Sequence, residues 1–377
     1  MRLKLLEYSE HLGEPDEWTV EGLTLGNVNL LVGKNASGKS RILNIIHNSA
    51  RGIAAGRPFA NGHFSLVFDD NGKESRFELE IRDSRIEHER FKVDDEVLLD
   101  RGTGGVGTIF AVKEDKHIEF QTPENQPAVM TRRDRIQHPF FEPLHQWAGS
   151  LYYYAFGTSL GKDSFAVFIE GGFDVDAKNP SQVVAIFHKG QKDFGDRFVN
   201  AVCEDFRAVG YSIDEVGLSQ PRNLRLQRPV PGELAGIYVK EVDLPGRTDQ
   251  SSMSQGMFRA LSIIVQVNYS VLSDSPSCIL IDDIGEGLDY DRSCNLIDVL
   301  MKKAEDTSIQ LIMATNDRFV MNRVPLEAWS VVDRQGSRVK IRNYANSKEI
   351  FDDFKFTGLN NFDFLAFDYL HAGSANE

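Results

Sequence analysis

The chain has 377 residues, of which 41% are hydrophobic and 26% are charged, as in an ordinary globular protein with an ample core. No run of residues approaches the ~18 apolar positions of a membrane helix, so we expect no membrane partner. The net charge of −14 argues against a surface covered with nucleic-acid contacts, because phosphate binding needs concentrated lysine and arginine.

The cysteines and the first residues indicate a compartment. The cysteines lack metal-ligand spacing, which suits idle or buried thiols in a reducing environment. They are Cys203, Cys278 and Cys294. The N-terminal sequence becomes charged too early for a signal peptide. We therefore expect a cytoplasmic location.

The first predicted elements lead into a glycine loop. Residues 1 to about 32 are expected to form strands, of which 27–32 is buried and enters the loop. Residues 33–40, Gly-Lys-Asn-Ala-Ser-Gly-Lys-Ser, fit the pattern G-x-x-x-x-G-K-[ST], and apolar positions from Ile42 onward indicate a helix. Tyr8 and Trp18 are expected in the core, with stacking on an adenine as the alternative.

A strand, a glycine loop and a helix start together predict a phosphate cradle. Gly33 and Gly38 allow a tight turn whose N–H groups point inward. Lys39 is expected to reach the β- and γ-phosphates of ATP, and Ser40 to ligate Mg²⁺. The residues expected to contact the nucleotide here are Gly33, Asn35, Ala36, Ser37, Gly38, Lys39, Ser40 and Arg41.

The middle of the chain divides into a β region and a helical region. From about Gly62 to Phe120 apolar and polar residues alternate, and Asn71 with Gly72 predicts a hairpin turn. We therefore expect an antiparallel β arm. The region that follows, up to about residue 232, is expected to be largely helical, with a long amphipathic segment over 181–209.

A second strand carries two carboxylates at its end. Residues 277–283 form an apolar run that ends in Asp282 and Asp283. Asp282 is expected to bind Mg²⁺, directly or through water. Asp283 follows directly. In ATP-hydrolysing sites with a Mg²⁺-binding aspartate at a strand end, this next position usually holds a glutamate that orients the attacking water. Because aspartate is shorter, we expect either slower hydrolysis or a role shared with Glu286.

Further motifs follow in a characteristic order, and together they resemble a known group. Residues 253–257, Met-Ser-Gln-Gly-Met, open a helix, and a buried strand over 309–315 ends at Asn316. The chain resembles the non-transporter branch of the ATP-binding-cassette (ABC) ATPases, with the SMC, RecF and OLD-like AAA proteins. Residues 33–40 match its Walker A motif and Asp282 with Asp283 its Walker B region. Ser254 and Gly256 match its signature motif, and Leu288 with Asp289 its D-loop.

The resemblance implies an α/β fold, a P-loop ABC-type ATPase head with an antiparallel β arm and an inserted helical lobe but no long coiled coil. In this family two subunits pair head to tail, so Ser254 and Gly256 of one copy would cover the ATP of the other. Asn316 stands where the family has a switch histidine, and asparagine cannot change charge. Either Gln121 or Gln137 would sense Mg²⁺.

The expected domains are a Walker A segment with the arm (1–130), a mainly helical lobe (131–236), a C-terminal ATPase segment (237–345) and an aromatic tail (346–377).

The resemblance also implies a setting. Compact heads of this kind are often found in prokaryotic anti-phage defence systems, beside a nuclease or another toxic effector. The sequence contains no recognisable nuclease motif, so an effector would be a separate chain. The alternatives are a RecF-like or SMC-like DNA-repair ATPase, the nucleotide-binding subunit of a transporter, and a scaffold that does not hydrolyse ATP.

Two surface features have competing interpretations. DNA binding would need a groove built from three basic clusters, although solvated faces are the favoured interpretation. These clusters are Arg132, Arg133, Arg135 and His138; Arg222, Arg225 and Arg228; and Arg334, Arg338, Lys340 and Arg342. The aromatic residues of the tail are expected to pack on the core, with partner docking as the alternative. They are Phe354, Phe356, Phe362, Phe364, Phe367 and Tyr369.

Overall fold

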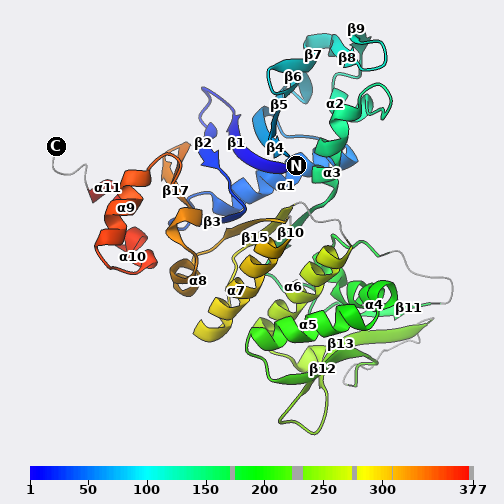
Figure 1. The fold of residues 1–377 in the computed structure, drawn as a ribbon, viewed down its shortest axis with the longest axis vertical. Coiled ribbons are helices and arrows are strands. Elements are labelled where there is room, and N and C mark those ends of the chain that lie inside the picture. Colours follow the sequence, from blue (N-terminus) through cyan, green and yellow to red (C-terminus); the bar gives the residue numbers. More distant parts are fainter. Residues whose placement is uncertain (170–174, 223–231, 274–277, 308, 373–377) are drawn as a thin grey trace. The chain divides into compact units, whose positions relative to one another are not determined.

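The computed structural model describes residues 1–169, 175–222, 232–273, 278–307 and 309–372. The chain forms two compact units (Figure 1). We call the first the sheet unit, and it comprises Met1–Leu151, Gln310–Asn316 and Val324–Glu377. We call the second the helix-rich unit, and it comprises Tyr152–Ile309 and Asp317–Arg323. The three segments of the sheet unit are therefore far apart in the sequence.

The strands of the sheet unit follow the order β16-β3-β17-β18-β2-β1-β4-β5-β6-β7-β8-β9. Their bounds are β1 (Arg2–Glu10), β2 (Trp18–Thr24), β3 (Val28–Val32), β4 (Gly62–Asp70), β5 (Lys73–Arg82), β6 (Arg85–Val93), β7 (Glu96–Arg101), β8 (Val106–Ala111), β9 (Lys116–Gln121), β16 (Gln310–Ala314), β17 (Trp329–Gln335) and β18 (Arg338–Asn343).

Strand β3 lies between β16 and β17 and runs parallel to both. Its residues Leu30, Leu31 and Val32 are fully buried, because a parallel strand in the middle of a sheet is covered on both faces. The predicted buried strands 27–32 and 309–315 are thus confirmed as β3 and β16. Their carboxyl ends lie at the same edge of the sheet, where the glycine loop begins.

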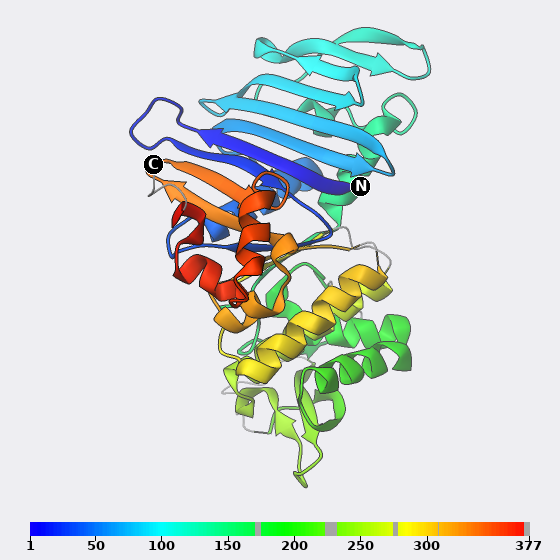
Figure 2. The same cartoon turned by 60° about the vertical axis from the view of Figure 1, so that its left-hand side comes forward.

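The strands from β4 to β9 form successive antiparallel pairs (Figure 2). Asp70 pairs with Lys73 across the turn at Asn71 and Gly72, and both turn residues have positive φ, 55° and 89°. This geometry confirms the predicted hairpin, since such turns match the twist of the strands. Strand β6 was not predicted individually, because frequent charged residues interrupt its alternation of apolar and polar positions.

The helices of the sheet unit include α1, which follows the glycine loop and packs against α3 (Figure 1). The helices are α1 (Lys39–Ala55), α2 (Ala128–Thr131), α3 (Glu142–Gly149), α9 (Lys348–Phe356), α10 (Asn361–Ala366) and α11 (Tyr369–Ala372). Short 3₁₀ turns cover Thr103–Gly105, Pro139–Phe141 and Leu326–Ala328. The apolar face of α1, with Ile42 and Ile46 fully buried, supports the predicted start of this helix.

In the helix-rich unit, β10 (Leu151–Ala155) lies beside β15 (Cys278–Asp282). A small sheet has the order β11-β13-β12 with β14 paired to β13, and α6 packs against α4 and α5 (Figure 1). The remaining strands are β11 (Ala166–Phe168), β12 (Ile213–Ser219), β13 (Glu233–Glu241) and β14 (Thr248–Asp249). The helices are α4 (Val183–Phe194), α5 (Asp196–Ala208), α6 (Gln255–Leu272), α7 (Tyr290–Asp306) and α8 (Arg318–Arg323), with 3₁₀ turns at Pro180–Gln182 and Gln250–Ser252.

The structure shows the middle of the chain in more detail. The amphipathic segment 181–209 forms two helices, α4 and α5, because Gly195 with φ 58° ends α4. The expected boundaries after residues 130 and 236 fall inside α2 and β13. The region 131–236, which was expected to be mainly helical, also contains strands. One of them, β10, lies beside β15, which comes much later in the chain. Across the described residues, every helix is too short or too polar to span a bilayer.

Candidate functional site

The glycine loop of the sheet unit joins the end of β3 to the start of α1. A Cβ atom added to Gly33 would lie 2.8 Å from the carbonyl oxygen of Val332. Gly38 has φ 111°, and a Cβ atom there would lie 3.0 Å from the Trp18 ring. Both positions therefore require glycine. The tight path that the sequence predicted for a phosphate loop is present.

The loop offers donors to an anion. The Lys39 side chain is buried and its ammonium group donates to the carbonyl oxygens of Gly33, at 2.9 Å, and Lys34, at 3.2 Å. No side chain caps the N-terminus of α1, so its first N–H groups are available to a ligand. Within the described residues, Ser37 Oγ is buried without a hydrogen-bond partner. The residues present thus fit a triphosphate, which would satisfy these groups.

Two side chains from elsewhere in the sheet unit lie at this loop. Arg334, at the end of β17, donates from Nη1 to the carbonyl oxygen of Ala36 at 3.0 Å. Sequence reasoning had assigned Arg334 only to a basic cluster. Asn316 is exposed and comes two residues after Ala314, which is in register with Leu31 of β3. Asn316 therefore follows β16 at the strand edge where the loop begins.

The aromatic residues before the loop belong to the core. Tyr8 is 4% exposed and Trp18 is 2% exposed, so the favoured interpretation of both is confirmed. The Arg41 guanidinium lies 4.0 Å above the Trp18 ring and forms an ion pair with Glu10. Arg41 is exposed on the first turn of α1.

In the helix-rich unit, the carboxylate of Asp282 lies at the end of β15 and is 7% exposed. The main-chain N–H of Phe156 donates to the Asp282 carbonyl oxygen at 2.8 Å, and the Tyr153 hydroxyl lies 3.5 Å from Oδ2. Burial and the neighbouring Asp282 carboxylate raise the pKa of Tyr153 to about 12, so the phenol keeps its proton. A carboxylate with a hydroxyl donor suits Mg²⁺.

Asp283 and Glu286 approach the same point on the loop after β10. A Cβ atom added to Gly157 would lie 2.8 Å from Glu286 Oε2 and 3.3 Å from Asp283 Oδ2. Asp283 has φ 54°, an uncommon conformation for a residue with a side chain. The structure therefore brings the two candidate water-orienting carboxylates together, and Gly157 leaves the space that they occupy.

The residues of the predicted signature motif begin α6. Ser254 is the N-cap and accepts a hydrogen bond from the N–H of Met257 at 3.1 Å. A Cβ atom added to Gly256 would lie 2.4 Å from the Gly287 carbonyl oxygen, so the helix start packs tightly on the segment before Asp289. Asp289 in turn caps α7. Each copy therefore presents Ser254 as an exposed helix cap.

Arg259 is the residue of this unit that sequence reasoning missed. It is 9% exposed and donates to three main-chain carbonyl oxygens, those of Gly157 at 2.6 Å, Thr158 at 2.7 Å and Glu286 at 3.0 Å. The only signal in the sequence was one arginine within the apolar run of the helix after Gly256.

The two glutamine candidates lie in or near the β arm of the sheet unit. Gln121, in β9, donates from its amide to the Gly104 carbonyl oxygen. The amide of Gln137 donates to Glu114, and its carbonyl oxygen accepts from the N–H of Lys113. Both side chains thus hold local loops. In the helix-rich unit, the Tyr153 side chain contacts Asp282.

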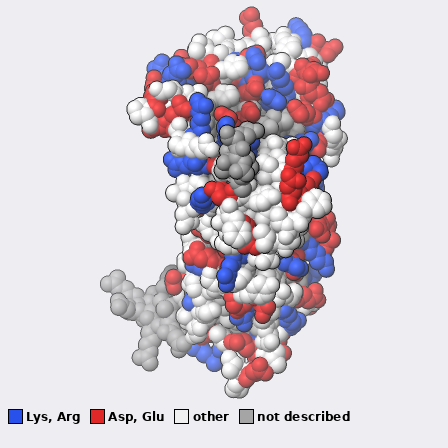
Figure 3. All heavy atoms as spheres, turned by 90° about the vertical axis from the view of Figure 1, so that its left-hand side faces the viewer, with Lys and Arg blue, Asp and Glu red and all other residues white. Residues whose placement is uncertain are grey.

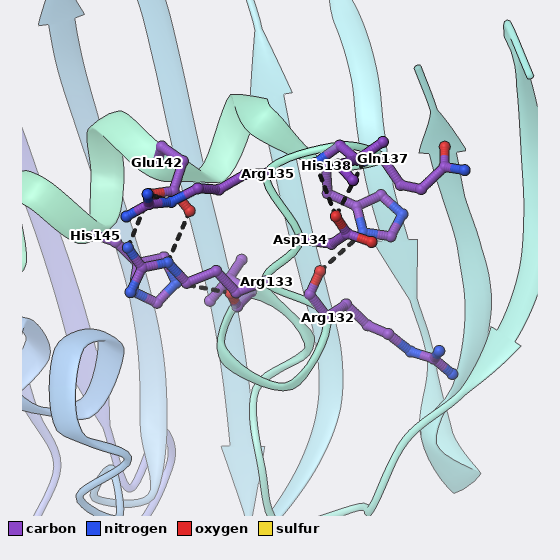
Figure 4. Close-up of polar contacts among 10 residues, drawn as sticks. Arg132, Arg133, Asp134, Arg135, Gln137, His138, Glu142 and His145 are labelled. Atoms are coloured by element: carbon purple, nitrogen blue, oxygen red, sulfur yellow. Dashed lines mark hydrogen bonds and ion pairs between the residues drawn. The ribbon is translucent and has the colours of Figure 1, made fainter. Parts of the chain in front are cut away.

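Members of the first basic cluster make local contacts within the sheet unit (Figure 4). Arg133 donates two hydrogen bonds to Glu142, at 2.7 and 2.8 Å, and Arg135 lies 3.4 Å from the same carboxylate. His138 contacts the Arg132 carbonyl oxygen, and the Arg132 guanidinium lies over Phe120. Of the second cluster, Arg225 and Arg228 lie outside the described residues. On the face drawn in Figure 3, basic and acidic side chains are interspersed.

Comparisons with known proteins show a likeness in fold. No family model and no curated protein matches the chain. An SMC head bound to the C-winged helix domain of ScpA has a TM-score of 0.53 and 14% identity, with 91% of this chain and 97% of that chain covered. The SMC head domain from Thermotoga maritima has a TM-score of 0.45, 16% identity and coverage of 91% and 99%. The SMC head with an extended coiled coil derived from Pyrococcus furiosus has a TM-score of 0.46 and 11% identity, with 94% of this chain and 99% of that chain covered.

The first of these comparisons supports a conclusion about the fold class. The chain has a mixed α/β fold similar to that of the SMC head bound to the C-winged helix domain of ScpA. The phosphate loop and the strand-end carboxylate occur in it with the geometry described above. At 14% identity the likeness concerns the fold alone.

Proposed function

We propose that the protein is an ABC-type ATPase that binds ATP with Mg²⁺, hydrolyses it to ADP and phosphate, and dimerises around it. The single observation that carries the proposal is the phosphate loop. Its glycines cannot be replaced without steric conflict, its lysine lies inside the loop, and its helix start has no side-chain cap. Each of these features suits a bound triphosphate.

The residues of the chain would act as follows. Lys39 and the helix N-terminus hold the β- and γ-phosphates, and Ser40 with Asp282 provides oxygen ligands for Mg²⁺. When bound, Mg²⁺ neutralises phosphate charge. Asp283 and Glu286 orient water, and Asn316 donates to the γ-phosphate. Ser254 and Gly256 contribute the start of α6 to the nucleotide of a second copy, because an exposed helix N-terminus attracts anions.

The proposal also includes a cellular role. We infer a switch within a cytoplasmic protein assembly of prokaryotic anti-phage defence, in which a separate effector chain carries the toxic activity. The resemblance of the motifs to compact defence ATPases supports this role, as does the lack of a recognisable nuclease motif in the sequence. Purification of the native complex and identification of the co-purifying chain tests it. A membrane transporter or a DNA-repair complex in that preparation would contradict it.

The enzymatic part is tested with purified protein. We expect Lys39→Ala to weaken ATP binding and to lower turnover by at least ~100-fold, since it removes the charge aimed at the transferred phosphoryl group. Asp282→Asn should retain ATP binding and lose Mg²⁺-dependent turnover. Lys73→Ala is the matched control, because Lys73 is exposed in the β arm. A wild-type protein that binds no ATP would refute the proposal, and binding without turnover would leave only a nucleotide-responsive scaffold.

Dimerisation is tested by mass. Asp283→Asn should slow hydrolysis and preserve bound ATP, so the mass of this variant should double when Mg²⁺ and ATP are added. The double variant Asp283→Asn with Ser254→Arg should remain a monomer, because a bulky side chain at the start of α6 obstructs the approach of a second nucleotide site. A mass that does not change with nucleotide would contradict ATP-dependent pairing.

A further inference from the structure

The C-terminal segment of the sheet unit contacts the phosphate loop. A cavity of about 280 Å³ has residues 33–37 of the loop on one side and residues from the end of β17 on another. Its third side is formed by the C-terminal segment, through Phe364, Leu365, Asp368, Leu370 and His371. A ligand on this side of the loop would therefore also touch the C-terminal segment.

Charged groups connect the segment to the loop. The ammonium group of Lys34, the second residue of the loop, lies 3.4 Å from Asp368 Oδ2. The His371 ring bridges two carboxylates, with Nδ1 2.8 Å from Asp368 Oδ1 and Nε2 3.3 Å from Asp333 Oδ2. Arg334 also lines the cavity. Two carboxylates, Asp333 and Asp368, thus lie beside the loop in the lining of this cavity.

The segment has a firm part and a weakly held part. Phe364 is 1% exposed and stacks on Phe351 at 4.8 Å, with Trp329 and Phe354 also in ring contact. By contrast, the Asp368 side chain is 52% exposed and the Lys34 side chain 78%. Ion pairs exposed to this extent add little stability. Tyr369 packs on the anchor as well, with its ring 5.1 Å from Phe354 and 5.9 Å from Phe364. The exposed contacts of Asp368 with the loop can therefore break at little cost, whereas a full opening of the segment also separates Tyr369 from these two rings.

We propose that residues 367–372 are a latch that closes on the phosphate loop and competes with nucleotide for it. The proposal rests on the ATP-binding function proposed above. In the closed state Asp368 forms an ion pair with Lys34. Together with Asp333, it repels the phosphates of an incoming nucleotide. In the open state Lys34 and Arg334 face the nucleotide without Asp368. Nucleotide binding and latch opening are then linked, since each favours the other.

The latch has a built-in dependence on pH. Hydrogen bonds with Asp368, followed by the nearby charge of Asp333, raise the pKa of His371. The imidazolium form can donate to both carboxylates at once, whereas the neutral ring has one donor. The other charged side chains that line the cavity are Lys34 and Arg334. The latch is therefore fully closed below the ordinary histidine range and weakens as the pH rises through the raised pKa of His371.

The test measures Mg²⁺-ATP affinity of the full chain at low salt. We expect Asp368→Asn to bind about two- to fivefold more tightly than wild type, the range for loss of one exposed ion pair. Asp353→Asn is the matched control, because Asp353 is an exposed carboxylate on α9 that does not line the cavity and its change alters the net charge equally. His371→Gln should remove the extra rise of affinity with pH that the wild type shows between pH 6 and 8.

Hydrogen exchange gives a second, independent readout. The main-chain amides of residues 367–372 should exchange faster in Asp368→Asn than in Asp353→Asn, and faster in wild type when ATP is added. Equal affinity and equal exchange in the two variants would overturn the latch, and so would weaker ATP binding by Asp368→Asn, which would make the segment a supporting lid. A wild type without ATP affinity refutes the enzymatic proposal instead, and the exchange comparison still decides whether Asp368 holds the segment.

Discussion

Arg259 donates a hydrogen bond from Nη1 to the main-chain carbonyl oxygen of Glu286 at 3.0 Å. The same guanidinium holds the loop after β10 through the carbonyl oxygens of Gly157 and Thr158. Arg259 therefore ties the start of α6, which carries Ser254, to the loop after β10 and to the loop after β15 that holds Asp283 and Glu286. A displacement of the helix start would be transmitted to these loops, because one planar group donates to all of them.

We expect Arg259→Lys to uncouple these elements. A lysine keeps the charge but cannot hold three carbonyl groups in the geometry of a guanidinium, so buried acceptors lose their donors at a cost of about 1–3 kcal/mol in the free energy of unfolding. Turnover should fall at least ~10-fold because Glu286 loses its orientation. Urea denaturation and steady-state ATPase assays measure the two effects.

The same variant should bind ATP almost as well as wild type, since the phosphate loop belongs to the sheet unit. Arg197→Lys on α5 is the control, because Arg197 is exposed and its replacement tests only the change of residue type. Loss of ATP affinity in Arg259→Lys, or wild-type turnover, would show that Arg259 does not act on the carboxylate loops.

Gly157→Ala tests the convergence of Asp283 and Glu286. The added methyl group would lie 2.8 Å from the end of the Glu286 side chain, which can move away at little cost to stability. We expect a melting temperature within about 2 °C of wild type and a clear loss of turnover. Gly246→Ala is the control, because a Cβ atom there meets nothing within 4 Å. Full activity in Gly157→Ala would exclude a role for this Glu286 position.

Local patterns in the sequence predicted much of the fold. The phosphate loop, its flanking strand and helix, and the hairpin at Asn71 and Gly72 are each encoded within a few consecutive residues. The burial of Tyr8 and Trp18 could also be predicted from residue type. The arm strands with clear alternation were found, whereas β6 was not, because its polar residues obscure the period.

The remaining parts of the site depend on contacts between distant residues. Arg259 and Gly157 are 102 positions apart, Arg334 and Ala36 are 298 apart, and Lys34 and Asp368 are 334 apart. No local pattern encodes such pairs, because they arise only when distant segments meet in the folded chain. The division into two units has the same origin, since the sheet unit joins three segments that are far apart in the sequence.

Arg334→Ala tests the cation that the fold adds to the phosphate loop. The change removes one exposed charge next to Ala36, so we expect ATP affinity to fall about three- to tenfold, as for loss of a charge-assisted contact. Stability should hardly change, because water replaces the lost donor. Arg338→Ala, on the same hairpin and exposed, should bind ATP as wild type does. Equal affinities in the two variants would remove Arg334 from the binding site.

Glu142→Gln tests the pairing of Glu142 with Arg133 and Arg135 in the first basic cluster. Hydrogen bonds from Arg133 are the main cause that lowers the pKa of Glu142 from 4.5 to about 2. Because the pKa of Glu142 is lower in the folded state than in the unfolded state, the carboxylate stabilises the fold above about pH 4.5, and this contribution is lost as the pH falls toward 2.

Urea midpoints of wild type should therefore drop over this range more steeply than those of Glu142→Gln. Glu96→Gln, at an exposed position, should follow the wild type. If Glu142→Gln kept the wild-type slope, the cluster would be open to solvent, and salt-dependent DNA binding by Arg133 and Arg135 would become the better interpretation.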